Sequence, residues 1–267
     1  MYTFISLISN LWQSKRILFL TTFIELKKRY AGSVLGIGWI LFYPALLLGM
    51  YMFVYQAVFK VKITGIDSSF EYSLFVLCGL IPYLGFAEVM NSSVLTLSQN
   101  RHLITNVIVP MELLPVRVVT VALVSQCMAM AILIALLLFA GGKVSVYWLY
   151  VPIMFLLEFF FLAGLAFIFS ALGVLLRDLA QFMAILTLFL LFVSPVGYTK
   201  EMVPESLRMI LYANPVWYLA DSFRDPLLYG RLPDWNFMLI YVLATAVLFI
   251  GGSYIFKKTL YTLSDLA

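Results

Sequence analysis

Two carboxylic acids in this sequence lie inside long apolar stretches, where an ionised side chain is hardest to accommodate. Glu88 precedes Asn91, Ser92 and Ser93, whereas the residues on either side of Glu158 are apolar. An acid surrounded by hydrocarbon is paired, faces water or takes part in a function such as proton transfer. Glu158 is therefore a candidate site near the middle of a membrane. For Glu88 we favour a structural hydrogen bond, within or between subunits, over a proton or substrate site.

The motifs that would let the chain drive chemistry by itself are missing. No G-x-x-x-x-G-K-[ST] motif is present to cradle nucleotide phosphates, and Gly142-Lys143 is followed by Val144. The single histidine, His102, has no Cys or His neighbour and no Ser or Asp at a catalytic spacing, which disfavours a metal site or a triad. Cys78 and Cys127 occupy apolar runs and are expected to be small buried side chains. We therefore expect no cofactor in this chain and an energy source outside it.

Aromatic residues recur at a helical spacing that could serve a substrate with apolar faces. Tyr51, Tyr55 and Phe59 are four residues apart and share one helix face, with Trp39 and Tyr43 on a neighbouring strip. Aromatic side chains at the ends of a span ordinarily form interfacial belts in contact with lipid. Tyr51 and Tyr55 lie deeper, where a phenol needs a partner or a wet lumen. Both interpretations stay open at this point.

The composition requires a membrane. The chain has 267 residues, of which 64% are hydrophobic and 11% charged, too few charges to cover a water-soluble surface of that size. The first ten residues contain no Lys or Arg, which disfavours a cleavable signal peptide. We expect an all-α polytopic protein that forms a single transmembrane domain over residues 1–267. The six expected transmembrane helices cover residues 34–59, 72–97, 113–140, 146–176, 179–199 and 236–257.

The Lys and Arg residues favour one side of these spans. With the N-terminus inside, the cytoplasmic bases are Lys15, Arg16, Lys27, Lys28, Arg29, Arg101, Arg117, Arg177, Lys257 and Lys258. The cytoplasmic acids are Glu25, Glu112, Asp178 and Asp265, and bases and acids are equal in number outside. By the positive-inside rule both termini lie in the cytoplasm. The distribution of the Lys and Arg residues thus orients the chain, and the net charge of +4 does not indicate nucleic-acid binding.

Two segments are expected to lie at the membrane surface. Over residues 10–30 an apolar stripe predicts an amphipathic helix in the cytoplasmic interface, formed by Trp12, Phe19, Phe23, Leu26 and Tyr30. This helix is either a generic lipid anchor or a surface that a cytoplasmic partner also touches. In residues 200–234, Pro204 begins one short helix and Asn214-Pro215 begins a second, with Asn as the N-cap. Both are too short to span, so we expect re-entrant half-helices in the exterior leaflet, with a flat exterior hairpin as the alternative.

Several segments together resemble a known family over nearly the whole chain. They run from Arg29 to Pro44, from Asn106-Val107-Ile108-Val109-Pro110 through Leu114-Pro115, over Arg177-Asp178, and from Asn214-Pro215 through Phe223-Arg224 to Leu228-Tyr229-Gly230. In this combination they resemble the permease subunit of ABC-2 type polysaccharide exporters, which move O-antigen, capsule or teichoic acid chains. Val109 replaces the Phe that often precedes this Pro in the family, a departure that affects one packing contact.

The resemblance implies a set of partners. They are a second copy of this chain in a homodimer, two copies of an ATP-binding cassette subunit that binds ATP and Mg, and a polysaccharide linked to undecaprenyl diphosphate. It also implies the lipids of a bacterial cytoplasmic membrane. The segment 10–30 becomes the interface helix, and residues 204–224 become exterior gate helices. Residues Gln99–Val109 become part of the cytoplasmic coupling or gating region, and the candidates for coupling to the ATPase are Arg29, Asn100, Arg101 and His102.

Sugars present C–H faces that stack on aromatic rings, so an aromatic lumen offers a long polymer weak, repeated contacts. The candidate lining residues are Trp39, Tyr43, Tyr51, Tyr55, Phe189 and Tyr198, with Trp217 and Tyr218 near the exit. Two other functions remain open. One is an ABC-2 exporter of a small hydrophobic molecule or lipid, and the other is a membrane-embedded glycolipid enzyme that uses Glu88 or Glu158.

Overall fold

The computed structural model describes residues 11–54, 57, 69–100, 110–141, 144–176 and 178–264, apart from the side chains of 201 and 261–264. All the regular elements in this part of the chain are helices, which confirms the expected all-helical class there. The elements are α2 (Lys15–Arg29), η1 (Gly36–Gly38), α3 (Trp39–Phe53), α4 (Ser69–Gln99), α6 (Leu113–Phe139), η3 (Val146–Tyr150), α7 (Val151–Leu175), α8 (Leu179–Val193), η4 (Lys200–Met202), η5 (Glu205–Leu207), α9 (Arg208–Tyr212), α10 (Pro215–Leu227) and α11 (Trp235–Ser264).

Five helical segments of the described chain are long and apolar enough to cross a membrane, and they make this a multi-pass membrane protein. They cover Gly36–Phe53, Ser69–Gln99, Leu113–Phe139, Val146–Leu175 and Trp235–Leu260. The sixth expected span is not confirmed, because α8 is an apolar helix of only 15 residues. It ends at Val193, and Pro195 follows directly after its C-cap residue Ser194. Proline cannot donate the amide hydrogen bond that would continue a helix, which accounts for the end of α8.

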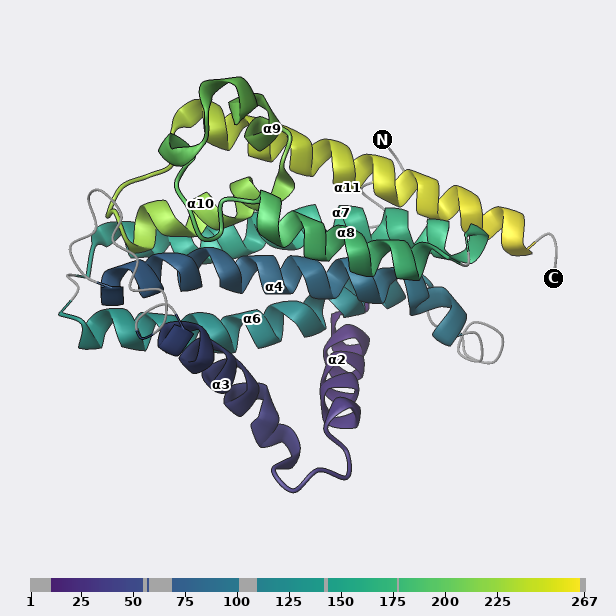
Figure 1. Ribbon diagram of the computed structural model, residues 1–267. Coiled ribbons are helices and arrows are strands. Elements are labelled where there is room, and N and C mark those ends of the chain that lie inside the picture. Colours follow the sequence, from purple (N-terminus) through teal and green to yellow (C-terminus); the bar gives the residue numbers. More distant parts are fainter. Residues whose placement is uncertain are drawn as a thin grey trace.

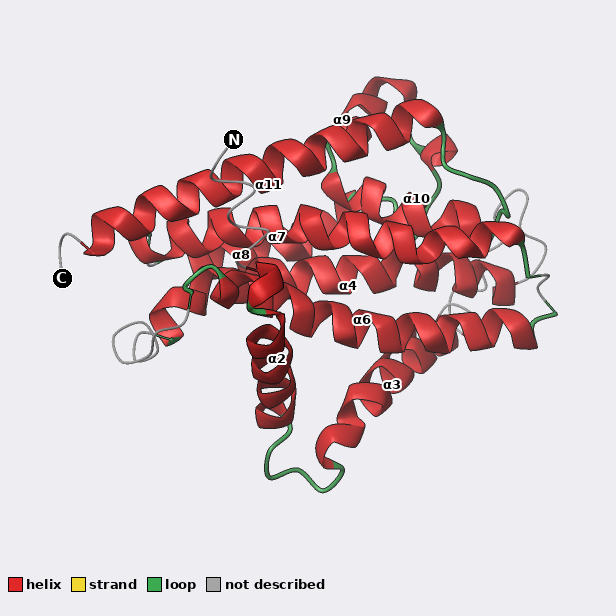
Figure 2. Cartoon of the chain, turned by 180° about the vertical axis from the view of Figure 1, so that it is seen from behind, coloured by secondary structure: helices red, strands yellow, loops and turns green. Residues whose placement is uncertain are grey.

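The long helices form a bundle with α4 at its centre. Helices α6, α7 and α8 lie alongside α4, and α11 crosses the outer side of α7 (Figures 1 and 2). In the most apolar stretch of α4, 83% of the residues are buried, compared with 6% in the span that contains α3. Close packing uses glycine, since a Cβ atom at Gly164 of α7 would lie 2.5 Å from the backbone carbon of Leu248 on α11. Helix α10 lies near one end of the bundle, and α2 is attached to the side of the other half, which we call the α2 end (Figure 1).

Helix α2 lies across the bundle instead of along it, and the chain then turns into α3 (Figure 1). It packs on α6, where the Thr22 hydroxyl forms a 2.8 Å hydrogen bond with the hydroxyl of Thr120, and Leu26 is also buried. Trp12 and Phe19, at or near its N-terminal end, are 70% and 73% exposed. A helix that buries a narrow strip and leaves large apolar side chains uncovered is suited to lie in a membrane interface.

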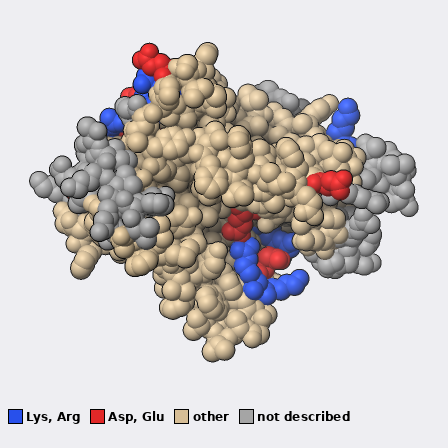
Figure 3. Space-filling model, viewed as in Figure 1, with Lys and Arg blue, Asp and Glu red and all other residues tan. Residues whose placement is uncertain are grey.

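Charged side chains are sparse on the face of the molecule drawn in Figure 3. They gather over α2 and around α9, with a few more at the right-hand side of the view, and most of the remaining described surface is uncharged (Figure 3). The expectation that Cys127 is a buried side chain is wrong. Cys127 is exposed, whereas Cys78 is buried as expected. Cys127 lies on the apolar helix α6, whose outer side chains contact lipid in a membrane, so an apolar sequence run did not imply burial within the chain.

Candidate functional site

Helix α10 begins with the cap that the sequence predicts. The side-chain oxygen of Asn214 accepts a hydrogen bond from the Val216 amide at 3.0 Å, and Pro215 occupies the first helical position. This cap satisfies an amide of the first turn that has no partner within the helix. The side-chain amide of Asn214 also donates to the Ser194 hydroxyl at 2.9 Å. The start of α10 is therefore tied to the end of α8.

Arg224 fixes the other half of α10 to the bundle. Its side chain is buried and donates to the carbonyl oxygens of Pro195 and Val196, each at 2.6 Å, and to the Asp221 carboxylate at 3.1 Å. Its guanidinium carbon lies 3.9 Å from the ring centroid of Phe75 on α4, where a cation–π contact forms. A Cβ atom at Gly79 would overlap the guanidinium, so glycine at that position makes room for it. A buried cation is tolerated here because each side of it meets an acceptor or a ring.

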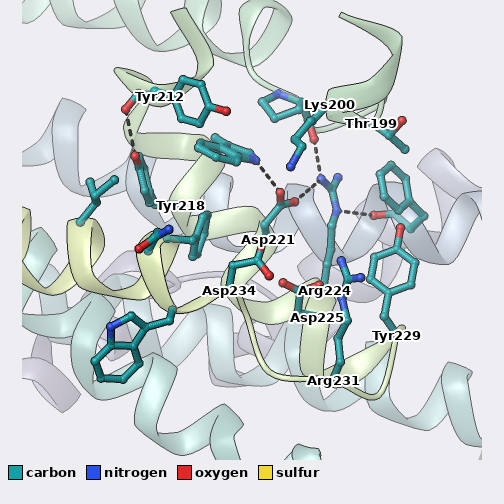
Figure 4. A pocket seen from close by; sticks show the side chains of 17 residues that line it. Thr199, Lys200, Tyr212, Tyr218, Asp221, Arg224, Asp225, Tyr229, Arg231 and Asp234 are labelled. Atoms are coloured by element: carbon teal, nitrogen blue, oxygen red, sulfur yellow. Dashed lines mark hydrogen bonds and ion pairs between the residues drawn. The ribbon is translucent and has the colours of Figure 1, made fainter. Parts of the chain in front are cut away.

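A cavity of about 620 Å³ opens beside these contacts (Figure 4). It is bounded by α10, by the connection from α10 to the start of α11, by α9 and the segment before it, and by one residue of α4, and we call it the α10 cavity. Its walls combine aromatic rings with side chains of both charges. They are formed by Phe75, Pro195, Thr199, Lys200, Tyr212, Trp217, Tyr218, Asp221, Arg224, Asp225, Tyr229, Arg231, Asp234, Trp235, Asn236, Phe237 and Ile240.

The charged groups of the α10 cavity are partly neutralised by one another. Asp221 accepts hydrogen bonds from the Trp217 ring nitrogen and from Arg224, and the Arg231 guanidinium donates to Asp225 at 2.8 Å (Figure 4). Burial raises the pKa of the Asp225 carboxyl above its ordinary value, while the hydrogen bond from Arg231 acts in the opposite direction. These pairs give the cavity a polar wall beside its aromatic rings.

Trp217 and Tyr218, the two aromatic residues predicted near an exit, lie in one aromatic cluster. They are 6% and 7% exposed, and both contact Phe237 of α11 at ring-centroid distances of 5.1 and 4.9 Å. The Tyr218 hydroxyl donates to the carbonyl of Tyr212 at 3.0 Å. Tyr198 is half-buried and donates its hydroxyl to the Val193 carbonyl. The structure thus brings Trp217 and Tyr218 to the α10 cavity, whose lining does not include Tyr198.

The other predicted lining residues are distributed along the bundle. Tyr43 and Phe189 are 56% and 57% exposed in the single chain. Trp39 and Tyr51 are half-buried, and Tyr51 packs against the core of the bundle. Tyr43 also borders a second cavity of about 260 Å³ between α3, α4 and α6. Tyr55 lies outside the described residues, so a lumen formed by these side chains stays a prediction.

At the α2 end, two of the predicted coupling residues lie at a third cavity, of about 390 Å³. Arg29 of α2 donates to Glu88 of α4 at 2.6 Å, which gives Glu88 the structural partner that we expected for it. Arg117 donates to the side chain of Asn100 at 3.0 Å. Arg101 and His102 lie outside the described residues. The α2 helix is therefore joined to α4 by an ion pair beside a cavity whose lining carries three bases and two acids.

Comparison with known proteins identifies the family. Residues 17–228 match the family described as ABC-2 type transporter. The chain belongs to that family. It is 28% identical over 243 residues to the O-antigen export system permease protein RfbA of Klebsiella pneumoniae, an alignment that covers 91% of each chain. It is also 28% identical over 256 residues to RfbA of Myxococcus xanthus, which covers 95% of this chain and 96% of that one. The polysialic acid transport protein KpsM of Escherichia coli is 24% identical over 237 residues, 85% of this chain and 87% of its own.

Glu158, the candidate site inside the membrane, is fully buried in this ABC-2 permease. One of its carboxylate oxygens accepts a hydrogen bond from the side-chain amide of Gln126 at 2.7 Å, and the other has no partner among the described residues. The Gln126 oxygen points at Gly85 of α4, where a Cβ atom would overlap it. The interaction therefore joins α7 to α6 and depends on a glycine in α4.

Sequence reasoning missed two residues of these sites. Gln126 stands in a span with few polar residues, and that isolation in an apolar run was the available signal. Arg224 belongs to the predicted helix that begins at Asn214-Pro215, but no role was assigned to its side chain. Its spacing of three from Asp221 is the spacing of an ion pair on one helix face, but nothing local indicates its contacts with Phe75 or Pro195.

Proposed function

We propose that this ABC-2 permease is the transmembrane subunit of an exporter that moves a lipid-linked polysaccharide across the bacterial cytoplasmic membrane. ATP and Mg²⁺ bind to a separate ATP-binding cassette subunit, which hydrolyses the nucleotide. The similarity to the two RfbA permeases and to KpsM carries the proposal, because it extends over at least 85% of this chain in each case. All three names refer to the export or transport of a glycan.

The exposed apolar surface supports assembly of two copies. Helix α3 begins at Trp39 and packs on the bundle along a small part of its surface, so Tyr43 and neighbouring apolar side chains are uncovered in one chain. In the proposed homodimer these side chains and Phe189 face the other copy across a passage. Aromatic walls give a sugar polymer many weak contacts, and a polymer held by weak contacts can slide. The carrier is undecaprenyl diphosphate, and both chain termini lie in the cytoplasm.

Coupling to the ATPase takes place at the α2 end. Helix α2 lies across the bundle, and the Arg29–Glu88 ion pair connects it to α4, the central helix. A displacement of α2 by a cytoplasmic subunit is therefore transmitted to α4 through a direct contact. Asn100, Arg101 and His102, at the end of α4 and just beyond it, complete the proposed coupling surface.

ATPase measurements test the division of labour. We expect the purified chain alone to show no ATP hydrolysis and its complex with the cassette subunit to hydrolyse ATP. Hydrolysis by the lone chain would contradict the proposal. Turnover of a lipid-linked sugar by the lone chain, abolished by Glu158→Gln, would favour a membrane-embedded enzyme instead.

Gene deletion tests the substrate class. Removal of the gene should eliminate a surface polysaccharide and leave resistance to hydrophobic drugs unchanged. The opposite pattern, an intact surface glycan with increased drug sensitivity, would identify an ABC-2 exporter of small hydrophobic molecules.

A further inference from the structure

We propose that the α10 cavity is a saccharide-binding site, which holds sugar units of the exported chain outside the main passage. This inference rests on the proposed function, because it takes the ligand class from the transported polymer. The volume of the α10 cavity, about 620 Å³, falls within the range of small-ligand sites in proteins.

The first step is the polar chemistry of its walls. Lys200 and Asp234 both line the cavity and are exposed, and neither side chain forms a hydrogen bond or ion pair with another described residue. Lys200 can donate hydrogen bonds and Asp234 can accept them. A sugar hydroxyl both donates and accepts, so a glycan can satisfy the two residues together.

The second step is the aromatic wall. Trp235 is 80% exposed at the cavity, next in sequence to Asp234, and Tyr212 is 53% exposed. Trp235 offers a large ring to the C–H face of a sugar, and the rings of Trp217 and Tyr218 are already packed on Phe237. Exposed aromatic rings beside hydrogen-bonding side chains are the combination that an uncharged polyol requires.

The third step is preorganisation. The Arg224 contacts with Pro195, Val196 and Asp221 fix one wall of the cavity before any ligand arrives. The Arg231–Asp225 hydrogen bond orders another part of it. A fixed wall reduces the entropy lost on binding, so a few weak contacts are enough for measurable affinity.

Charge favours a neutral sugar over a phospholipid headgroup. The lining carries three acids and three bases, and two of the bases, Arg224 and Arg231, are already paired with carboxylates. Among the described residues of the lining, a phosphate would therefore meet one cation outside an ion pair, Lys200, in a cavity that also contains the carboxylate of Asp234. Neutral hydroxyl groups avoid that repulsion.

The experiment measures binding to the full complex with its cassette subunit in lipid nanodiscs. The probes are short oligosaccharides released by mild acid from the surface polysaccharide of the source bacterium. Isothermal titration calorimetry measures their dissociation constants. We expect saturable binding to the wild type and a rise of about threefold to tenfold in the dissociation constant for Trp235→Ala. Asp234→Asn should weaken binding to a similar degree. The matched control is Trp12→Ala, since Trp12 is also exposed, at 70%, and does not line the α10 cavity.

Three outcomes would overturn the site. They are no binding to the wild type, equal affinity in the wild type and Trp235→Ala, or displacement of the probe by phosphatidylethanolamine with loss of lipid binding in the same variants. Trp235 and Asp234 are exposed, so their replacement is not expected to prevent folding, and co-purification of each variant with the cassette subunit at the wild-type melting temperature verifies this. Deletion of the gene separates the two proposals. If the surface glycan survives deletion, the proposed function fails, whereas glycan loss without oligosaccharide binding rejects only the site.

Discussion

At the scale of single residues, the structure concentrates its polar chemistry in a few buried groups. Arg224 is 1% exposed and Glu158 is fully buried, and each depends on a glycine of α4 that leaves room for the interaction. A buried charge that loses its partner costs more than the intact pair contributes, because the remaining group is left without water. These residues should therefore tolerate substitution much less well than charges at the surface.

Arg224→Gln is expected to destabilise the protein by roughly 3 kcal/mol, as seen when one partner of a buried pair is removed. The substitution leaves the Pro195 and Val196 carbonyls and the Asp221 carboxylate short of donors. Thermal unfolding in detergent measures the effect. The control is Arg208→Gln, because its partner Glu205 is 89% exposed and a pair with an exposed member should contribute about 1 kcal/mol or less. Equal melting temperatures for the two variants would show that Arg224 does not hold α10 in place.

At the scale of elements, glycines serve two different purposes. Gly32-x-x-x-Gly36 has a spacing that can allow two helices to approach, yet a Cβ atom at either position meets nothing within 4 Å in the described chain. Both glycines have positive φ, at 80° and 51°, so they form the turn between α2 and α3 instead. The close helix contact lies elsewhere, where Gly164 of α7 faces Gly252 of α11.

Adjacent glycines of α11 provide a direct test of that contact. In Gly252→Ala the new methyl group would meet the backbone oxygen of Gly164, and overpacking should cost about 1–3 kcal/mol. Gly251→Ala meets nothing within 4 Å in this chain and should be neutral or slightly stabilising, since alanine favours helix. Thermal unfolding of the two variants measures the difference. A tolerated Gly252→Ala would mean that α7 and α11 pack less closely than the structure indicates.

At the scale of the whole molecule, one chain leaves a large apolar surface without a protein partner. The span that contains α3 is 6% buried, whereas the most apolar stretch of α4 is 83% buried. Lipid or a second copy of the chain must cover α3 in a membrane. The proposed homodimer places part of this surface, including the aromatic side chains of α3, against the other copy and the passage between them.

Tyr51→Ala is expected to slow the export of long chains while the complex still assembles, because an aromatic contact with the sliding polymer is lost. The amount and length of surface glycan on gels measure export, and co-purification with the cassette subunit measures assembly. Leu243→Ala is the control, since Leu243 is 56% exposed on α11, away from the proposed passage. Unchanged glycan length and flux in Tyr51→Ala would place this side chain outside the lumen.

The sequence by itself determined the membrane class, the positions of the long apolar helices, the start of α10 at Asn214-Pro215 and the family. These features depend on the length of an apolar run, on a helix cap and on short motifs. Residues that are close together in the sequence determine all three. Tertiary structure decided that Arg224 reaches Phe75 across 149 residues, that Thr22 meets Thr120 across 98, and that Gln126 is the partner of Glu158. It also decided that Cys127 faces outward and that α8 ends short of a full span. In a chain that is apolar on nearly every side, hydrophobicity does not distinguish the face that meets lipid from the face that meets protein, so only packing makes that choice.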